Sequence, residues 1–192
     1  MFLIVSLCGL WAGSVYVPSA ITFIAQREGR PAAEAAQLAS YSSGLLGIAT
    51  ILGAFLVPGL ADRFGRRATL GIFYVVMMVA LWVSFGEVFY MKENALVWFM
   101  VCAFMLGLGG ANFIVYSFWL PEQYGTECRA SAFAFITNFG RFAAAGFTFL
   151  VGFGAQRYGS IGVPVGLTAL AFVVGLALLP FGYETRGKPL PA

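Results

Sequence analysis

Histidine is absent from this 192-residue chain, and charged residues of either sign are scarce. Only 10% of the residues are charged, whereas 60% are hydrophobic. A soluble domain of this length would have too few polar residues to cover its surface. The composition therefore predicts an integral membrane protein whose main partner is the lipid bilayer.

The same scarcity argues against an enzyme. Histidine is missing, lysine occurs only at Lys92 and Lys188, and no apolar run holds paired carboxylates, so neither a Ser-His site nor a metal-hydrolase site can be assembled. Cys8, Cys102 and Cys128 have neither metal-ligand spacing nor a CxxC motif. We expect no catalytic residue, no metal and no cofactor. The net charge of +3 needs no nucleic acid, because a bias of basic residues towards the cytoplasm accounts for it.

Two further absences concern the interior of the membrane. No apolar run carries arginines at every third position, which excludes a voltage-sensing segment. No run carries an Asp or Glu near its middle, so the chain offers no obvious buried carboxylate to carry a proton. A proton-coupling group would have to come from elsewhere.

Long apolar runs fill most of the chain. A helix needs roughly 20 apolar residues to cross the bilayer core, whereas a barrel would show alternation. The runs therefore predict an all-α protein with six transmembrane helices and short polar joints. The predicted spans are about 2–26, 37–61, 68–86, 95–120, 130–154 and 160–182.

Basic residues in the joints give the orientation. With the 59–67 joint inside, six basic residues lie on the cytoplasmic side and four outside, which places both termini and the tail 186–192 in the cytoplasm. The inner set is Arg63, Arg66, Arg67, Arg129, Arg186 and Lys188, and the outer set is Arg27, Arg30, Lys92 and Arg157. Met1 lies within or almost within a span and follows no basic segment. A cleaved signal peptide is therefore not expected, and we expect a chain that lacks what normally precedes it.

An internal repeat connects the two halves of the chain. Residues 61–66 read ADRFGR and residues 155–160 read AQRYGS, while GLWAGS at 9–14 resembles GLGGAN at 107–112. Both offsets equal three spans, and an odd number of spans turns the second copy upside down in the bilayer. Although chance similarity remains an alternative, the pattern predicts an inverted three-plus-three repeat, which is common in transporters.

Three segments carry a family resemblance. GLADRFGRR at 59–67, LPEQYGTECRA at 120–130 and YETRGKPLP at 183–191, in this order and spacing, resemble the C-terminal half of a major facilitator superfamily (MFS) transporter. The resemblance covers essentially the whole chain. It implies a six-helix half-domain over residues 1–185 and a second partner, either a missing N-terminal half or a second copy. One departure is Pro58, which stands where the family usually has glycine.

The resemblance also implies a function. VYVPSA at 15–20 and TNFGR at 137–141 are similar to bacterial metabolite and organic-acid permeases of the inner membrane. We therefore expect transport of a small metabolite, an organic acid anion, by alternating access in an MFS secondary transporter that works by symport. Half of a sugar or drug permease and a truncated, non-transporting remnant stay open as alternatives.

The charged joints form the first candidate site. By the resemblance, Asp62 is held against the N-terminal end of a helix of the other half when the inner gate is shut, and the nearby arginines face the carboxylates of the other two cytoplasmic segments. The alternative is that the arginines only anchor the topology. The candidate network comprises Asp62, Arg63, Gly65, Arg66, Arg67, Glu122, Glu127, Arg129 and Glu184.

Arg141 is the second candidate. It lies 12 residues beyond Arg129, roughly 18 Å along a helix, close to the middle of the bilayer, where a charge is costly. Helical spacing places Asn138 on the same stripe as Arg141. Both are predicted to line an aqueous path and contact substrate, with a structural arginine as the alternative.

Three polar residues in other spans complete the predicted substrate site. Asn112 and Tyr116 share one face of the fourth span, which lines the cavity in this superfamily, and Tyr16 precedes Pro18 in the first span. Interhelical hydrogen bonds are the alternative for each. The glycines at 107, 110, 140 and 146 are read as close-packing positions.

Overall fold

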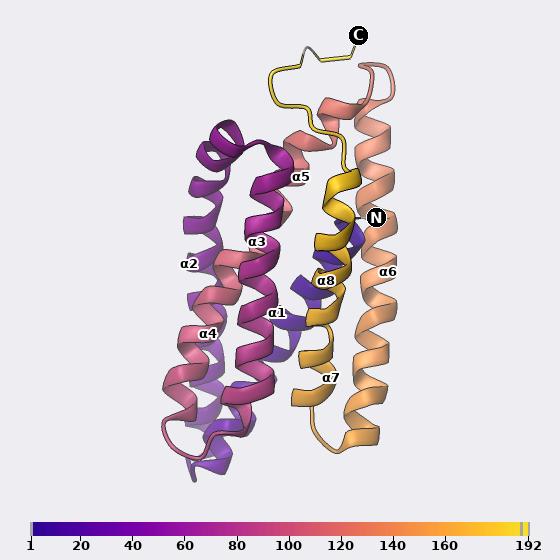
Figure 1. The fold of residues 1–192 in the computed structure, drawn as a ribbon. Coiled ribbons are helices and arrows are strands. Elements are labelled where there is room, and N and C mark those ends of the chain that lie inside the picture. Colours follow the sequence, from indigo (N-terminus) through magenta and orange to yellow (C-terminus); the bar gives the residue numbers. More distant parts are fainter. Residues whose placement is uncertain (1, 189, 192) are drawn as a thin grey trace.

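The computed structural model describes residues 2–188, 190 and 191, with the backbone alone at residues 12 and 13. Within these residues all regular elements are helical (Figure 1), and six helices or helix series are long and apolar enough to cross a membrane. The prediction of six transmembrane helices is confirmed. Residues 1, 189 and 192 of the predicted half-domain and tail lie outside the described residues.

The bounds of the spans follow from the helices. The first two spans are α1 (Phe2–Arg27) and α2 (Ala32–Phe64). The third is α3 (Arg66–Leu81) with the π-helix η1 (Trp82–Glu87) and the 3-10 turn η2 (Val88–Tyr90). The fourth joins α4 (Ala95–Gly110), α5 (Asn112–Trp119) and η3 (Pro121–Gln123); the fifth is α6 (Arg129–Tyr158); the sixth joins α7 (Gly162–Leu167), α8 (Ala169–Leu178) and η4 (Leu179–Phe181).

The helices extend past the apolar runs that predicted them. The second helix begins at Ala32 instead of 37 and continues to Phe64, so Glu34 and Asp62 belong to it. Apolarity marks only the part of a helix inside the hydrocarbon, whereas the backbone hydrogen bonds continue into the polar region.

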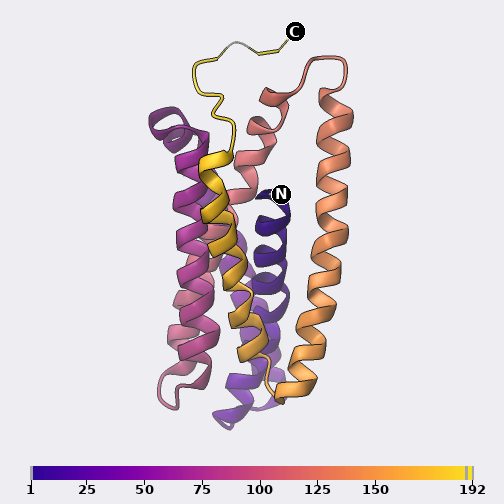
Figure 2. The same ribbon diagram turned by 45° about the vertical axis from the view of Figure 1, so that its right-hand side comes forward.

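The spans alternate in direction and gather the joints at two ends. Figures 1 and 2 show the 62–67 joint, the 120–129 joint and the C-terminal segment at one end, which we call the tail end. The connections 28–31, 91–94 and 159–161 lie at the opposite end.

The inverted repeat is visible in matched contacts at the two ends. Gly65 (φ 92°) and Gly159 (φ 64°) each follow a long helix and have positive φ, and 159 − 65 = 94. At the tail end Glu184 accepts a hydrogen bond from the Arg66 backbone, and at the opposite end Tyr90 bonds Ser160. The partners of these two contacts correspond under the repeat. Ser160 lies 94 residues after Arg66, and Glu184 lies 94 residues after Tyr90. Superposition of Gly65 on Gly159 stays a prediction.

The packing follows the repeat except at one place. Helix α2 packs on α4, and α6 packs on α1. These two pairs are equivalent, because the repeat relates the second span to the fifth and the fourth span to the first. Helix α2 also packs closely on α1, whereas α6 packs mainly on α1 and α7 and meets the fourth span chiefly at its end, η3. This departure leaves room between α1, α5 and α6.

Close helix approach depends on glycine at several crossings. A Cβ at Gly107 would overlap the Leu46 carbonyl of α2 and lie 2.7 Å from the Ala49 Cβ. Gly110 and Gly140 likewise face side chains of α1, as predicted for close-packing positions. The prediction is wrong for Gly146, where a Cβ would meet nothing within 4 Å.

Replacing Gly107 by alanine should test the α2–α4 crossing. The added methyl must push apart two backbones, so Gly107→Ala should destabilise the unit by about 1–3 kcal/mol and lower its thermal unfolding midpoint in detergent. Gly44→Ala on α2 is the matched control, since a Cβ there meets nothing within 4 Å. Equal midpoints for the two variants would contradict the close crossing.

Candidate functional site

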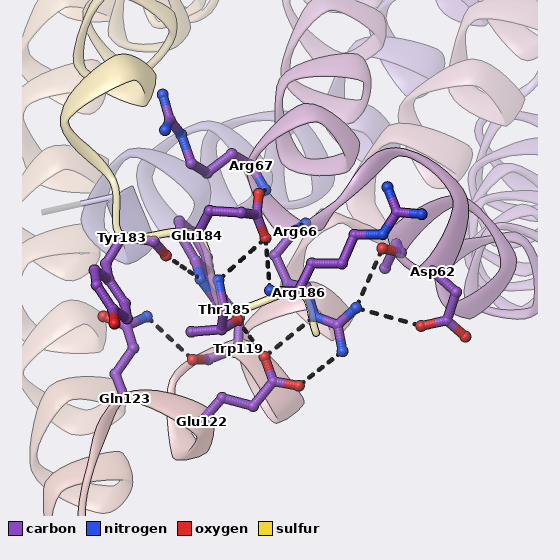
Figure 3. A network of polar contacts seen from close by, with 11 residues as sticks. Asp62, Arg66, Arg67, Trp119, Glu122, Gln123, Tyr183, Glu184, Thr185 and Arg186 are labelled. Carbon is purple, nitrogen blue, oxygen red and sulfur yellow. Dashed lines mark hydrogen bonds and ion pairs between the residues drawn. The ribbon is translucent and has the colours of Figure 1, made fainter. Parts of the chain in front are cut away.

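A network of charged and backbone groups joins three segments at the tail end (Figure 3). Its centre is Arg66, whose Nη2 and Nε donate to the two carboxylate oxygens of Glu122 at 2.8 and 3.1 Å. Only 15% and 19% of these two side chains are exposed, so the pair is shielded more than an ordinary surface ion pair. This bidentate, two-pronged contact fixes the orientation of the guanidinium. The expected ion pair between the 62–67 and 120–129 joints is therefore present.

Glu184 holds the third segment against the start of α3. Its carboxylate accepts the backbone N–H groups of Arg66 and Arg67 at 3.0 and 3.1 Å, two donors that the first turn of a helix leaves free. A negative charge at this position also complements the helix dipole. Gly65 makes the approach possible, because a Cβ there would lie 2.8 Å from the Glu184 Oε2 and the backbone has positive φ.

The pKa of Glu184 reflects this arrangement. Burial raises the pKa of a carboxyl group, but hydrogen bonds from the backbone N–H groups of Arg66, Arg67, Arg186 and Thr185 favour its charged form. The net effect lowers the pKa of Glu184 below its ordinary value of 4.5.

Several members of the network were not predicted from the sequence, Thr185 and Trp119 among them. The Thr185 hydroxyl donates to Glu122, and the indole N–H of Trp119 donates to the Tyr183 carbonyl at 2.9 Å. Both contacts depend on how residues 183–186 fold back over the end of α5 (Figure 3). The only sequence signal was their adjacency to Glu184 and Glu122.

The remaining charged candidates have other surroundings. The Arg63 guanidinium lies 5.4 Å from the centre of the Phe64 ring, and Arg67 donates from its side chain to the Leu179 carbonyl. The expectation that Arg63 and Arg67 face carboxylates with their side chains is therefore wrong, because each finds a nearer partner. Arg129 donates to the carbonyls of Tyr124 and Pro191.

Two carboxylates of the predicted network are exposed. Asp62 lies 3.3 Å from Arg66 with 78% of its side chain exposed, an arrangement that leaves it open to a further partner. Glu127 is exposed and makes no ion pair within the described part of the chain. The role of the network as a gate stays a prediction.

Arg141 borders a cavity in the space that α6 leaves beside the fourth span. The cavity has a volume of about 380 Å³ and is lined by Leu7, Leu10 and Trp11 of α1, Phe113 of α5 and Arg141 itself. The Arg141 side chain forms no ion pair with a described residue; its contact is a long 3.5 Å hydrogen bond to the Asn138 Oδ1. The structure thus brings Asn138 and Arg141 together beside a largely apolar cavity.

Tyr16 lies at a separate cavity of about 360 Å³, together with residues of α6. Its hydroxyl donates to the Thr148 carbonyl at 3.1 Å. Tyr16 therefore ties α1 to α6 and does not border the Arg141 cavity.

Asn112 and Tyr116 need correction as substrate contacts. Both side chains are buried, with exposures of 0% and 2%, so neither is open to a ligand in this arrangement. The Tyr116 hydroxyl bonds Ser6 and Tyr74 at 3.0 and 2.6 Å, which joins α1, α3 and α5. The i, i+4 spacing correctly placed Asn112 and Tyr116 on one face, but that face is turned into the helix packing.

Known structures share this architecture. A structure of the MFS proton:xylose symporter XylE bound to 6-bromo-6-deoxy-D-glucose matches 96% of the chain with a TM-score of 0.73 at 18% sequence identity. A partially occluded, inward-open structure of XylE from E. coli also matches 96%, with a TM-score of 0.73 at 19% identity. The fold is that of half an MFS transporter.

The match to these MFS structures is partial in length. The chain spans 44% and 48% of the two XylE chains, or about half of their length. No protein-family model and no curated protein matches the chain. The shared MFS fold and the six apolar helices make the chain a multi-pass membrane protein, and its substrate is a separate question.

Substitution of Arg66 should weaken the tail-end network. Arg66→Lys keeps the charge but loses the two-pronged contact with Glu122, so we expect a loss of about 1–3 kcal/mol in unfolding free energy. Arg63→Lys, in the same joint and outside the network, should change it by less than about 0.5 kcal/mol. Denaturant titration in mixed micelles measures both variants, and equal losses would contradict the central role of Arg66.

The stability contributed by Glu184 should depend on pH. Because the folded state lowers the pKa of Glu184, its contribution is complete above 4.5 and is lost as the pH falls through the lowered folded-state value. The difference in unfolding free energy between wild type and Glu184→Gln should therefore be largest near neutral pH and shrink below pH 4.5. A difference that stays constant down to about pH 3, well below the ordinary carboxyl range, would contradict the role of its charge.

Proposed function

We propose that the chain forms one half of a secondary transporter that moves a small metabolite across the membrane by alternating access. The observation that carries the proposal is the six-helix MFS fold, in which Arg141, without an ion pair to any described residue, borders a cavity within the bilayer region. A second six-helix unit, from a longer chain, another chain or a second copy, would complete the carrier. Alternating access requires two such units rocking about a central site.

Two helices offer surfaces for the second unit. In α2 and α6 only 22% of the most apolar stretch is buried, compared with 44–50% in the other four spans. Their exposed faces carry large apolar side chains, which suits a helix-packing surface as well as lipid contact. The exposed apolar residues of these helices include Tyr41, Ile48, Ile51, Phe55, Phe135, Phe139, Phe149 and Phe153.

The tail-end network supports a rigid inner end for such a unit. Arg66, Glu122 and Glu184 connect the second, third and fourth spans with the segment that follows the sixth. Asp62 stays exposed at the same end and could meet the helix N-terminus of a second unit. We propose that these groups move together as one side of a gate.

An organic acid anion is the substrate class that suits the Arg141 cavity. A guanidinium in the bilayer is costly, and the cost is offset when its planar fork binds a carboxylate. Four of the five lining residues are apolar, which suits the carbon skeleton of a small acid. A sugar, as in the XylE complex, remains the second candidate because of the shared fold, although it would need more hydrogen-bonding groups than this cavity wall offers.

Uptake assays on the assembled carrier test the proposal. Arg141→Ala should reduce uptake of the preferred organic acid at least ten-fold, and Arg141→Lys should also impair it, since lysine keeps the charge but not the two-pronged geometry. Arg157→Ala, at the end of the same helix, should leave uptake unchanged.

Three outcomes separate the alternatives. Unchanged acid uptake in Arg141→Ala would rule out the carboxylate contact. Uptake of sugars but not of acids would favour the sugar carrier. Absence of uptake for both classes in wild type, with the second unit present, would favour a non-transporting remnant.

A further inference from the structure

A third cavity, distinct from those at Arg141 and Tyr16, lies at the opposite end of the bundle. Its volume is about 510 Å³, and it is lined by the end of α1, the end of α6, η2 and the 159–161 connection. Its charged wall is Arg27 and its hydroxyl groups come from Ser19, Tyr90 and Ser160. Its apolar wall includes Phe23 and Phe89, whose rings stack with centres 5.4 Å apart.

Arg27 is held in place without losing its charge. Its two terminal nitrogens donate to the backbone carbonyls of Phe89 and Met91, which fixes the guanidinium at the cavity but does not neutralise it. No carboxylate of the described chain lies within ion-pair distance of it. The nearby Arg30, by contrast, pairs with both Glu28 and Glu34. Arg27 is thus a preorganised cation with donor capacity to spare.

Three hydroxyl groups line the same cavity as Arg27. Ser19 lies two turns before Arg27 on α1, so that both face the same cavity. The Tyr90 hydroxyl and the Ser160 Oγ are 3.1 Å apart and also border the cavity. The Tyr90–Ser160 bond uses one of the two hydroxyl protons and leaves the other. The guanidinium, the Ser19 hydroxyl and this remaining hydroxyl proton, around a partly apolar space, form a set of donors suited to an oxyanion that carries a carbon skeleton.

The position of the cavity indicates which oxyanion it meets. Three spans end at this cavity: the first at Arg27, the third at Tyr90 and the fifth at Tyr158. Tyr90, Trp98 and Tyr158, all exposed, surround the same end, and such aromatic residues collect at the level of lipid headgroups. At headgroup depth an arginine can donate charge-assisted hydrogen bonds to the phosphate of a lipid.

We propose that this cavity binds the phosphate of a phospholipid headgroup, with Arg27 as the charge partner and Ser19, Tyr90 and Ser160 as hydroxyl partners. The Phe23–Phe89 wall holds the glycerol and the first carbons of the acyl chains. Because none of these residues belongs to the Arg141 cavity or to the tail-end network, the site does not depend on the proposed transport role.

Thermal unfolding of delipidated protein in detergent tests the site. Dioctanoyl phosphatidylglycerol should raise the unfolding midpoint of wild type in a saturable way, whereas dioctanoylglycerol, which lacks the phosphate, should not. Arg27→Gln should weaken the apparent affinity at least about ten-fold, and Arg30→Gln, the matched control at the same end, should keep it. Native mass spectrometry should show one retained phospholipid in wild type and Arg30→Gln and its loss in Arg27→Gln.

Two milder variants keep the test decisive if Arg27→Gln fails to fold. The Ser19 hydroxyl makes no hydrogen bond within the described chain, so Ser19→Ala should preserve the fold and weaken binding about three-fold, and Arg27→Lys should weaken it as well. Wild-type affinity in both variants would overturn the proposal. Equal protection by dioctanoylglycerol would overturn phosphate recognition, and equal protection by inorganic phosphate would overturn the lipid as its source.

Discussion

Exclusion of charge from the bilayer core governs the whole molecule. A helix satisfies its backbone inside lipid, but no helix can shield a lone charge there without a partner or water. The charged side chains of the described chain accordingly gather at the two ends of the bundle, where they join loops and helix ends. Arg141 breaks this pattern, and the structure places it beside a cavity between α1, α5 and α6. Because a charge in the bilayer core is costly in free energy, Arg141 is the residue that most needs a functional explanation.

The repeat gives the two ends of the bundle equivalent contact positions, but the side chains at these positions differ. At the tail end, four backbone N–H groups and a two-pronged arginine contact surround Glu184 and Glu122. At the opposite end the equivalent contact is a single bond between the hydroxyls of Tyr90 and Ser160. Hydrogen bonds to charged groups are roughly twice as strong as neutral ones, so of these two equivalent contacts the one at the tail end is the stronger. At the opposite end, Arg27 forms no ion pair with a described carboxylate.

Features that depend on composition and on the order of segments could be predicted from the sequence. Features that depend on which residues of other segments a side chain contacts could not. Six helices follow from apolar length, and the Arg66–Glu122 pair follows from charges in joints that must share one end. Thr185 and Trp119 were missed because their contacts arise from a fold-back of the tail that no periodicity encodes. For Asn112 and Tyr116, spacing gave a shared face but not which helices that face meets, and Tyr116 meets Ser6 and Tyr74. Gly146 likewise lacks the neighbour expected of it.

Water access at position 141 is the most direct measure of the central claim, that this residue borders an aqueous path and not lipid. In a variant with Cys8, Cys102 and Cys128 replaced by serine, Arg141→Cys should react with a membrane-impermeant thiol reagent, which needs an ionised thiol in water. Leu170→Cys, at the apolar groove between α3 and α8, should not react. A preferred organic acid should slow the reaction at position 141. Equal resistance of both positions to the reagent would show that residue 141 faces lipid and would contradict the account.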